Sequence, residues 1–184
     1  MMANQQLIEL EPGKAEPASN RRSDPGRMRV TVVFTTIAGT LAALEAAANF
    51  ARHLNAEIVL VVAEVIYFRY PLENPPVPAD YFEKLCVALV DELEVDLTAT
   101  RIEIHFCRDQ VQCLQLALGP RSLVVLGAGR RWWSTRERRL ERALTRTGHR
   151  VILVSSGRSS RPDNARTQSV VRRLLAELTP QIAF

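Results

Sequence analysis

The chain has 184 residues, a formal net charge of +4 and a hydrophobic fraction of 47%, which fits one globular domain with additional segments. Its three cysteines cannot form a disulfide framework, and no apolar run reaches the length of a membrane span. The first 28 residues contain no apolar core of a secretion signal. We therefore expect a cytoplasmic protein without a membrane span.

Three parts follow one another along the chain. Residues 1–28 lack apolar periodicity and are predicted to form a disordered arm. Residues 29–156 form the predicted domain. Apolar runs at 29–35, 57–66, 122–126 and 151–155 and an alternating run at 101–107 predict five strands. Segments with helical apolar spacing alternate with them, at 40–54, 81–95, 110–118 and 135–147. Residues 157–184 are predicted to be a linker and an amphipathic helix over 165–178.

Side chains that favour helix starts mark several boundaries. Thr40, Asp80 and Asp109 are predicted to cap three helices, and Ser134 with Glu137 forms a capping-box pattern before a fourth. The intervening segment 67–79 contains four prolines and is predicted to be a loop.

Strictly alternating strands and helices predict an α/β fold, a three-layer doubly wound parallel sheet of five strands with an extra C-terminal helix. Such folds bind ligands beyond the carboxyl ends of the strands, where the strand order reverses. We place that crevice near residues 35–39 and 127–131.

The sequence resembles the universal stress protein family of the adenine-nucleotide α-hydrolase-like superfamily. The resemblance is carried by residues 29–62 (RVTVVFTTIAGTLAALEAAANFARHLNAEIVLVV), by SLVVLGAG over 122–129 and by TRTGHRVILV over 145–154. It implies a strand order of 3-2-1-4-5. It also implies a homodimer that forms through the last strand.

The ATP-binding branch of the family has an acid at the end of the first strand and a G-x-x-G-x(9)-G-[ST] run after the fourth. In this chain Thr35 stands at the acid position and Gly127 matches the first glycine. Arg130 stands at the second glycine, and the closing pair falls near Leu140 and Glu141. The chain thus resembles a divergent member with a degraded ATP-binding motif.

The candidate ligand is ATP or another adenine nucleotide, or a different anion, bound in the crevice. Glycines let backbone N–H groups approach an anion, arginines suit phosphate, and hydroxyls add hydrogen bonds. The candidate cofactor-binding residues are Thr35, Thr36, Gly127, Gly129, Arg130, Arg131, Ser134 and Thr135. The alternative is a tight turn at the strand exit with solvated arginines and a helix cap.

Other chemistry-bearing residues give weaker indications. Trp132 and Trp133 lie between arginines and suit contact with a protein partner or a ligand, or else packing over the sheet edge. The arginine-rich helix that follows contains interleaved acids, so we interpret it as a solvated face and expect no nucleic-acid partner.

His105 and Cys107 alternate on one strand, but further metal ligands at suitable spacing are missing, so no metal site is predicted. The three cysteines lack a C-x-x-C spacing and are predicted to be buried thiols. No nucleophile–base–acid set is recognisable, so no catalytic residue is assigned.

Two functions remain open at this stage. The first is a non-enzymatic regulatory or sensory module that binds a nucleotide or another anion after the first and fourth strands. The alternative is a ligand-free module with a closed crevice, which binds a protein through the basic, tryptophan-containing loop and the C-terminal helix.

Overall fold

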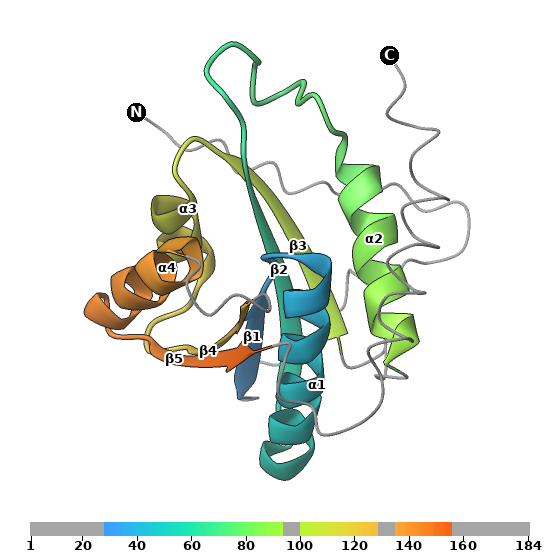
Figure 1. Cartoon of the computed structure of the whole chain (residues 1–184), viewed down its shortest axis with the longest axis vertical. Coiled ribbons are helices and arrows are strands. Elements are labelled where there is room, and N and C mark those ends of the chain that lie inside the picture. The colour runs from blue at the N-terminus through green and yellow to red at the C-terminus, as the bar shows by residue number, and fades with distance from the viewer. Residues whose placement is uncertain (1–27, 94–99, 129–134, 156–184) are drawn as a thin grey trace.

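The computed structural model describes residues 28–93, 100–128 and 135–155, where strands and helices alternate along the chain (Figure 1). The strands are β1 (Arg29–Val33), β2 (Glu57–Val65), β3 (Thr100–Cys107), β4 (Leu123–Ala128) and β5 (Arg150–Ser155). The helices are α1 (Ile37–Leu54), α2 (Ala79–Glu92), α3 (Gln110–Ala117) and α4 (Thr135–Arg146). The predicted arm over 1–28, Met28 aside, and the predicted linker and helix over 157–184 lie outside the described residues.

The strands form one parallel sheet in the order β3-β2-β1-β4-β5, which confirms the predicted α/β architecture. β3 and β5 are its edge strands. The chain runs outward from β1 to β3 and then returns to β4 on the other side of β1. The strand order therefore reverses between β1 and β4, where a ligand crevice was predicted.

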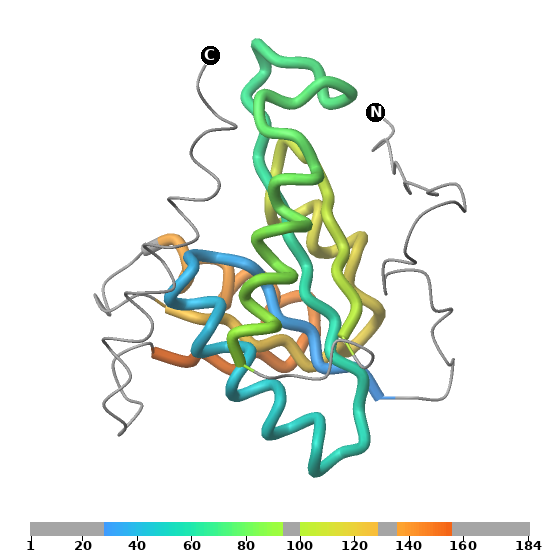
Figure 2. The backbone as a smooth tube through the Cα atoms, turned by 90° about the vertical axis from the view of Figure 1, so that its right-hand side faces the viewer, coloured from blue at the N-terminus to red at the C-terminus, as the bar shows by residue number. Residues whose placement is uncertain are grey.

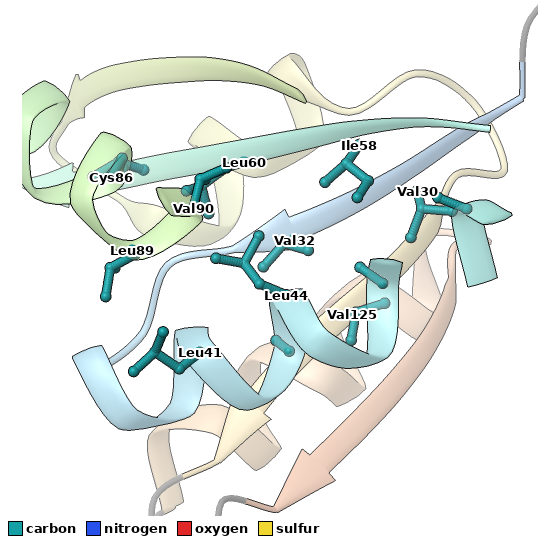
Figure 3. Packing of buried hydrophobic residues seen from close by; sticks show 14 of the residues in the cluster. Val30, Val32, Leu41, Leu44, Ile58, Leu60, Cys86, Leu89, Val90 and Val125 are labelled. Carbon is teal, nitrogen blue, oxygen red and sulfur yellow. The ribbon is translucent and has the colours of Figure 1, made fainter. Parts of the chain in front are cut away.

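Helices cover both faces of the sheet, with α1 and α2 on one side and α3 and α4 on the other (Figure 1). Alternation along β1 sends Val30 and Val32 to the first side, where they belong to one apolar cluster with Leu44 of α1 and Leu89 of α2 (Figure 3). Val33 faces the second side. The buried leucines of that side are Leu114, Leu118, Leu126, Leu140 and Leu144. Two apolar layers therefore hold the sheet, as its near-continuous apolar strands require.

Two predicted helix caps were wrong. α1 begins at Ile37, and its cap is Thr36, whose Oγ1 accepts a hydrogen bond from the backbone N–H of Gly39 at 3.1 Å. Thr40 lies inside the helix. α2 is preceded by Pro78, which offers no side-chain cap, and Asp80 lies in its first turn. Asp109 caps α3 as predicted, accepting from the N–H of Gln112 at 2.9 Å.

β2 and β3 extend past the ends of their neighbours. β1 stops at Val33, which pairs with Val61, whereas β2 continues beside β3 until Val65 pairs with Cys107. The segment between β2 and α2 therefore projects beyond the rest of the sheet (Figure 2). In the part of the chain that the structure describes, no helix has the length and apolarity to cross a membrane.

Candidate functional site

The predicted crevice lies where β1 leads into α1 and where β4 ends. Thr35 and Thr36 follow β1, and Gly127 is the penultimate residue of β4. The structure therefore brings these three predicted site residues together. It also directs the start of α1, an 18-residue helix, to the same place.

Thr35 joins the two segments directly. Its Oγ1 donates a 2.6 Å hydrogen bond to the carbonyl oxygen of Gly127. Its backbone N–H donates to Oγ1 of Thr40 at 3.2 Å, and the N–H of Thr40 donates to the carbonyl oxygen of Thr36 at 2.7 Å. The turn into α1 is thus held by its own hydroxyls, and that of Thr35, a predicted ligand contact, is among them.

The first turn of α1 also packs against β4 through two glycines. A Cβ atom placed on Gly127 would overlap the carbonyl group of Gly39. A Cβ atom placed on Gly39 would lie 2.7 Å from the carbonyl oxygen of Gly127. Both positions therefore need glycine because two backbone segments touch, whether or not an anion ever approaches Gly127.

Most of the remaining predicted site residues are not described. Gly129, Arg130, Arg131 and Ser134 lie outside the described residues, as do the two tryptophans at 132 and 133. Thr135 is the first residue of α4. The described part of the predicted site therefore consists of Thr35, Thr36 and Gly127, together with the start of α4 at Thr135.

Sequence reasoning missed a second surface, an aromatic loop formed by residues 66–70. Tyr67 and Phe68 have exposed fractions of 74% and 88%, and they lie at the tip where β2 projects from the sheet. Three aromatic residues in four positions, 67, 68 and 70, were the available signal. Large exposed aromatic side chains are uncommon on a protein surface and mark contact sites.

Arg108, the residue after β3, holds the aromatic loop in place. Its guanidinium donates hydrogen bonds to the carbonyl oxygens of Ile66 (2.8 Å), Tyr67 (2.6 Å) and Tyr70 (2.8 Å). The same group lies 5.0 Å from the centre of the Phe68 ring. The backbone that carries the aromatic side chains is therefore held in place by Arg108.

The face of β3 that points away from α2 carries polar side chains. Arg101, Glu103, His105 and Cys107 alternate with residues that pack towards α2, so His105 and Cys107 share a face as predicted. Among the described residues, no three His, Cys, Asp or Glu side chains are grouped to hold a metal ion.

The prediction of three buried thiols was right for Cys86 and wrong for the other two cysteines. Cys107 and Cys113 are only half-buried, because one lies at the end of an edge strand and the other on the short helix α3.

Comparisons with known proteins find similarity to solved structures. No protein-family model matches the chain, and no curated protein matches its sequence. A solved structure titled "Crystal structure of universal stress protein in complex with cAMP" is similar at 18% identity and a TM-score of 0.49, over 71% of this chain and 98% of that chain. That similarity is one of fold alone, and the fold is already given by the strand order of the sheet.

Proposed function

We propose that this protein is a non-enzymatic regulatory module with a universal-stress-protein-like fold that acts by binding a protein partner. The observation that carries the proposal is the aromatic loop. Phe68 and Tyr67 are exposed, and three hydrogen bonds from Arg108 fix the backbone that presents them. A loop that is ordered in advance loses little conformational entropy on binding, which favours recognition by a partner with an apolar pocket.

The contacts at the ends of β1 and β4 support this choice over a nucleotide sensor. The hydroxyl of Thr35 is engaged by Gly127, and the α1 start is packed against β4 at Gly39. In the ATP-binding branch of the family, a carboxylate at this position would accept hydrogen bonds from a ligand. At position 35 of this chain, a hydroxyl instead donates a hydrogen bond within the protein.

A second candidate function is the binding of ATP, another adenine nucleotide or a different anion. The observation that favours it is the start of α1 at the strand ends, since a helix N-terminus attracts anions. Arg130 and Arg131, which follow β4 in the sequence, would supply the charge. The two functions differ in whether a nucleotide stabilises the folded chain.

The proposal includes a homodimer that pairs through β5. β5 is an edge strand of the sheet, with β4 on one side. An edge strand offers backbone groups to a second copy. Sedimentation of the full chain at several concentrations tests this part, and a monomer at every concentration would remove it.

Affinity capture from the native cell with quantitative mass spectrometry tests the partner-binding function. The bait is the full chain, as wild type and as the variants Phe68→Asp and Leu54→Asp. Leu54 is a matched control because it is also exposed but ends α1 at the opposite end of the molecule (Figure 1). We expect a set of proteins that wild type and Leu54→Asp retain and Phe68→Asp loses. Identical capture by all three baits would overturn the proposal.

A further inference from the structure

We propose that the outer side of α4 binds the phosphate backbone of a duplex nucleic acid. The binding surface is an arginine face, formed by the exposed side chains of Arg139, Arg142 and Arg146. It is separate from the aromatic loop, so the inference does not depend on the proposed function. It reverses the interpretation drawn from the sequence, in which acids interleaved with the arginines gave a solvated face without a nucleic-acid partner.

Burial along α4 places its two sides. The helix lies beside α3 on one face of the sheet (Figure 1). Its buried side chains are Glu137, Leu140 and Leu144, at the helical spacing i, i+3 and i+7. The arginine face repeats the same spacing two residues later along the chain. Two residues turn an α-helix by about 200°, so the arginine face lies opposite the buried side.

The glutamates of α4 do not neutralise the arginine face. Glu137 is only 7% exposed and belongs to the buried side. Glu141 is half-buried, next to that side. Among the described residues, ion pairs join side chains of β1, β2 and β3, and none involves the arginine face. The acids that alternate with arginines in the sequence therefore leave the outer side of the helix positive.

Positive charge continues beyond both ends of the arginine face. In the first turn of α4, Arg136 is exposed and donates to Oε1 of Gln110 at 3.3 Å, a neutral partner. Past the end of the helix, Arg121 and Arg150 are exposed, and the N–H of Arg150 donates to the carbonyl oxygen of Ser122 at 3.0 Å. Positions 110–128 and 135–155 together contain seven arginines and two acids, so this side of the molecule attracts anions.

A straight row of positive charges suits a linear polyanion. Seven residues separate the first and last arginine of the face, so the row is about 10 Å long at 1.5 Å per residue. Each guanidinium can bind two phosphate oxygens through parallel N–H groups. Arginines clustered along one helix are the electrostatic feature by which proteins bind a nucleic-acid backbone.

Two features of α4 favour a duplex over a single strand or a membrane. Its sequence, TRERRLERALTR, contains no aromatic residue that could stack on an unpaired base. Its leucines are buried against the sheet, so no apolar side is left to enter a bilayer. Because the contacts are to phosphates, we expect binding that does not depend on base sequence, with a Kd of about 1 to 100 μM at physiological salt.

The fluorescence anisotropy of a labelled duplex DNA, titrated with the full chain, tests the proposal. Three phosphate contacts predict that log Kd rises with log salt with a slope of at least about 2.7, or about fortyfold weaker binding between about 50 and 200 mM salt. A second duplex of unrelated sequence should bind equally well. Absence of binding at the lowest salt, or a Kd that does not change with salt, would overturn the proposal.

A triple variant locates the contact on α4. It combines Arg139→Gln, Arg142→Gln and Arg146→Gln, and it should lower the slope by about 2.7. The matched control removes the same net charge from exposed arginines on other elements, with Arg29→Gln, Arg52→Gln and Arg69→Gln combined. We expect the control to keep the wild-type slope. Equal slopes for the two triple variants would overturn the assignment to α4. Circular dichroism checks that both are folded.

Other polyanions test the class of partner. Vesicles that contain phosphatidylserine, and polyglutamate of matched charge, should bind more weakly than the duplex at equal salt. Tighter binding to either one would overturn the assignment to nucleic acid. Phe68→Asp should bind the duplex as the wild type does, because the aromatic loop is not part of the arginine face. Failure of the partner-binding function would therefore leave this result unchanged.

Discussion

Thr35 donates a 2.6 Å hydrogen bond to the carbonyl oxygen of Gly127, a residue 92 positions further along the chain. This bond links the ends of β1 and β4 at the place where open parallel sheets bind ligands. Gly39 adds a backbone contact with the same glycine. The described residues of this region therefore pack against one another, and the exposed aromatic side chains lie elsewhere, at the aromatic loop.

The backbone contact between Gly39 and Gly127 predicts a strong penalty for Gly127→Ala. The new methyl group would overlap the Gly39 carbonyl group, so α1 or β4 must shift. We expect the free energy of unfolding to fall by about 3 kcal/mol or more, measured by urea denaturation. Gly119→Ala is the matched control, because the nearest atom to its new Cβ is 3.8 Å away. A loss of under about 0.5 kcal/mol for Gly127→Ala, the range expected of the control, would contradict the contact.

The hydroxyl of Thr35 can be tested separately from its shape. Thr35→Val keeps the shape and removes the donor to Gly127, and we expect it to lower the free energy of unfolding by about 1 kcal/mol. Thr35→Ser keeps the hydroxyl and should recover most of that stability. If valine and serine give equal losses, the hydrogen bond contributes nothing and packing explains the site.

Arg108 should control the order of the aromatic loop. Arg108→Gln removes the guanidinium that binds the carbonyl oxygens of Ile66, Tyr67 and Tyr70. We expect native-state cleavage by chymotrypsin at the aromatic loop to rise at least about tenfold, because each lost bond to a charged group is worth over about 1 kcal/mol.

Arg69→Gln provides the control for that experiment. The guanidinium of Arg69 lies 4.7 Å from the ring of Tyr70, a stacking contact beside the same backbone. We expect it to change the cleavage rate much less than Arg108→Gln does. Equal cleavage of both variants would show that Arg108 does not order the loop.

The pKa of Cys113 predicts an unusual pH dependence of alkylation. Its pKa is lowered from 9.0 to about 7, so the thiolate forms at a lower pH than in an ordinary cysteine. The rate of iodoacetamide labelling at position 113 should rise with pH through about 7 and then level off, as measured by mass spectrometry.

His105→Asn tests the cause of that profile. It removes an imidazole whose positive charge lowers the pKa of the Cys113 thiol, so that pKa should rise and the midpoint should move towards higher pH. Glu103→Gln should move it the same way, because Glu103 raises the pKa of His105. A midpoint near 9 already in the wild type would refute the electrostatic account.

The strands followed from the sequence because apolar periodicity and alternation with helices are local signals, whereas their order in the sheet was implied by the family resemblance. Every described helix and strand was predicted, with boundaries shifted by a few residues at most. Thr40 was mistaken for the cap of α1 because Gly39 suggested a turn. Gly39 instead lies inside the helix, where a glycine is needed because the backbone of Gly127 comes close. No local sequence pattern shows that contact.

The site was harder to predict because it depends on contacts between distant segments. The pairing of Thr35 with Gly127 and of Arg108 with the aromatic loop joins residues from separate elements. The half-exposure of Cys107 and Cys113 depends on the edge position of β3. The strand order, which only the resemblance implied, does not reveal how α3 covers that strand.

Thermal unfolding of the full chain at fixed salt, with and without millimolar ATP, ADP, AMP, cyclic nucleotides and sulfate, tests the central claim most directly. A nucleotide that binds only the folded state, present at 100 times its Kd, would add about 2.7 kcal/mol of stability. Because the ends of β1 and β4 are joined by Thr35 and Gly127, we expect no nucleotide to raise the unfolding temperature beyond the effect of sulfate. A clear rise with one adenine nucleotide and none with sulfate would contradict the account and establish the crevice as a binding site.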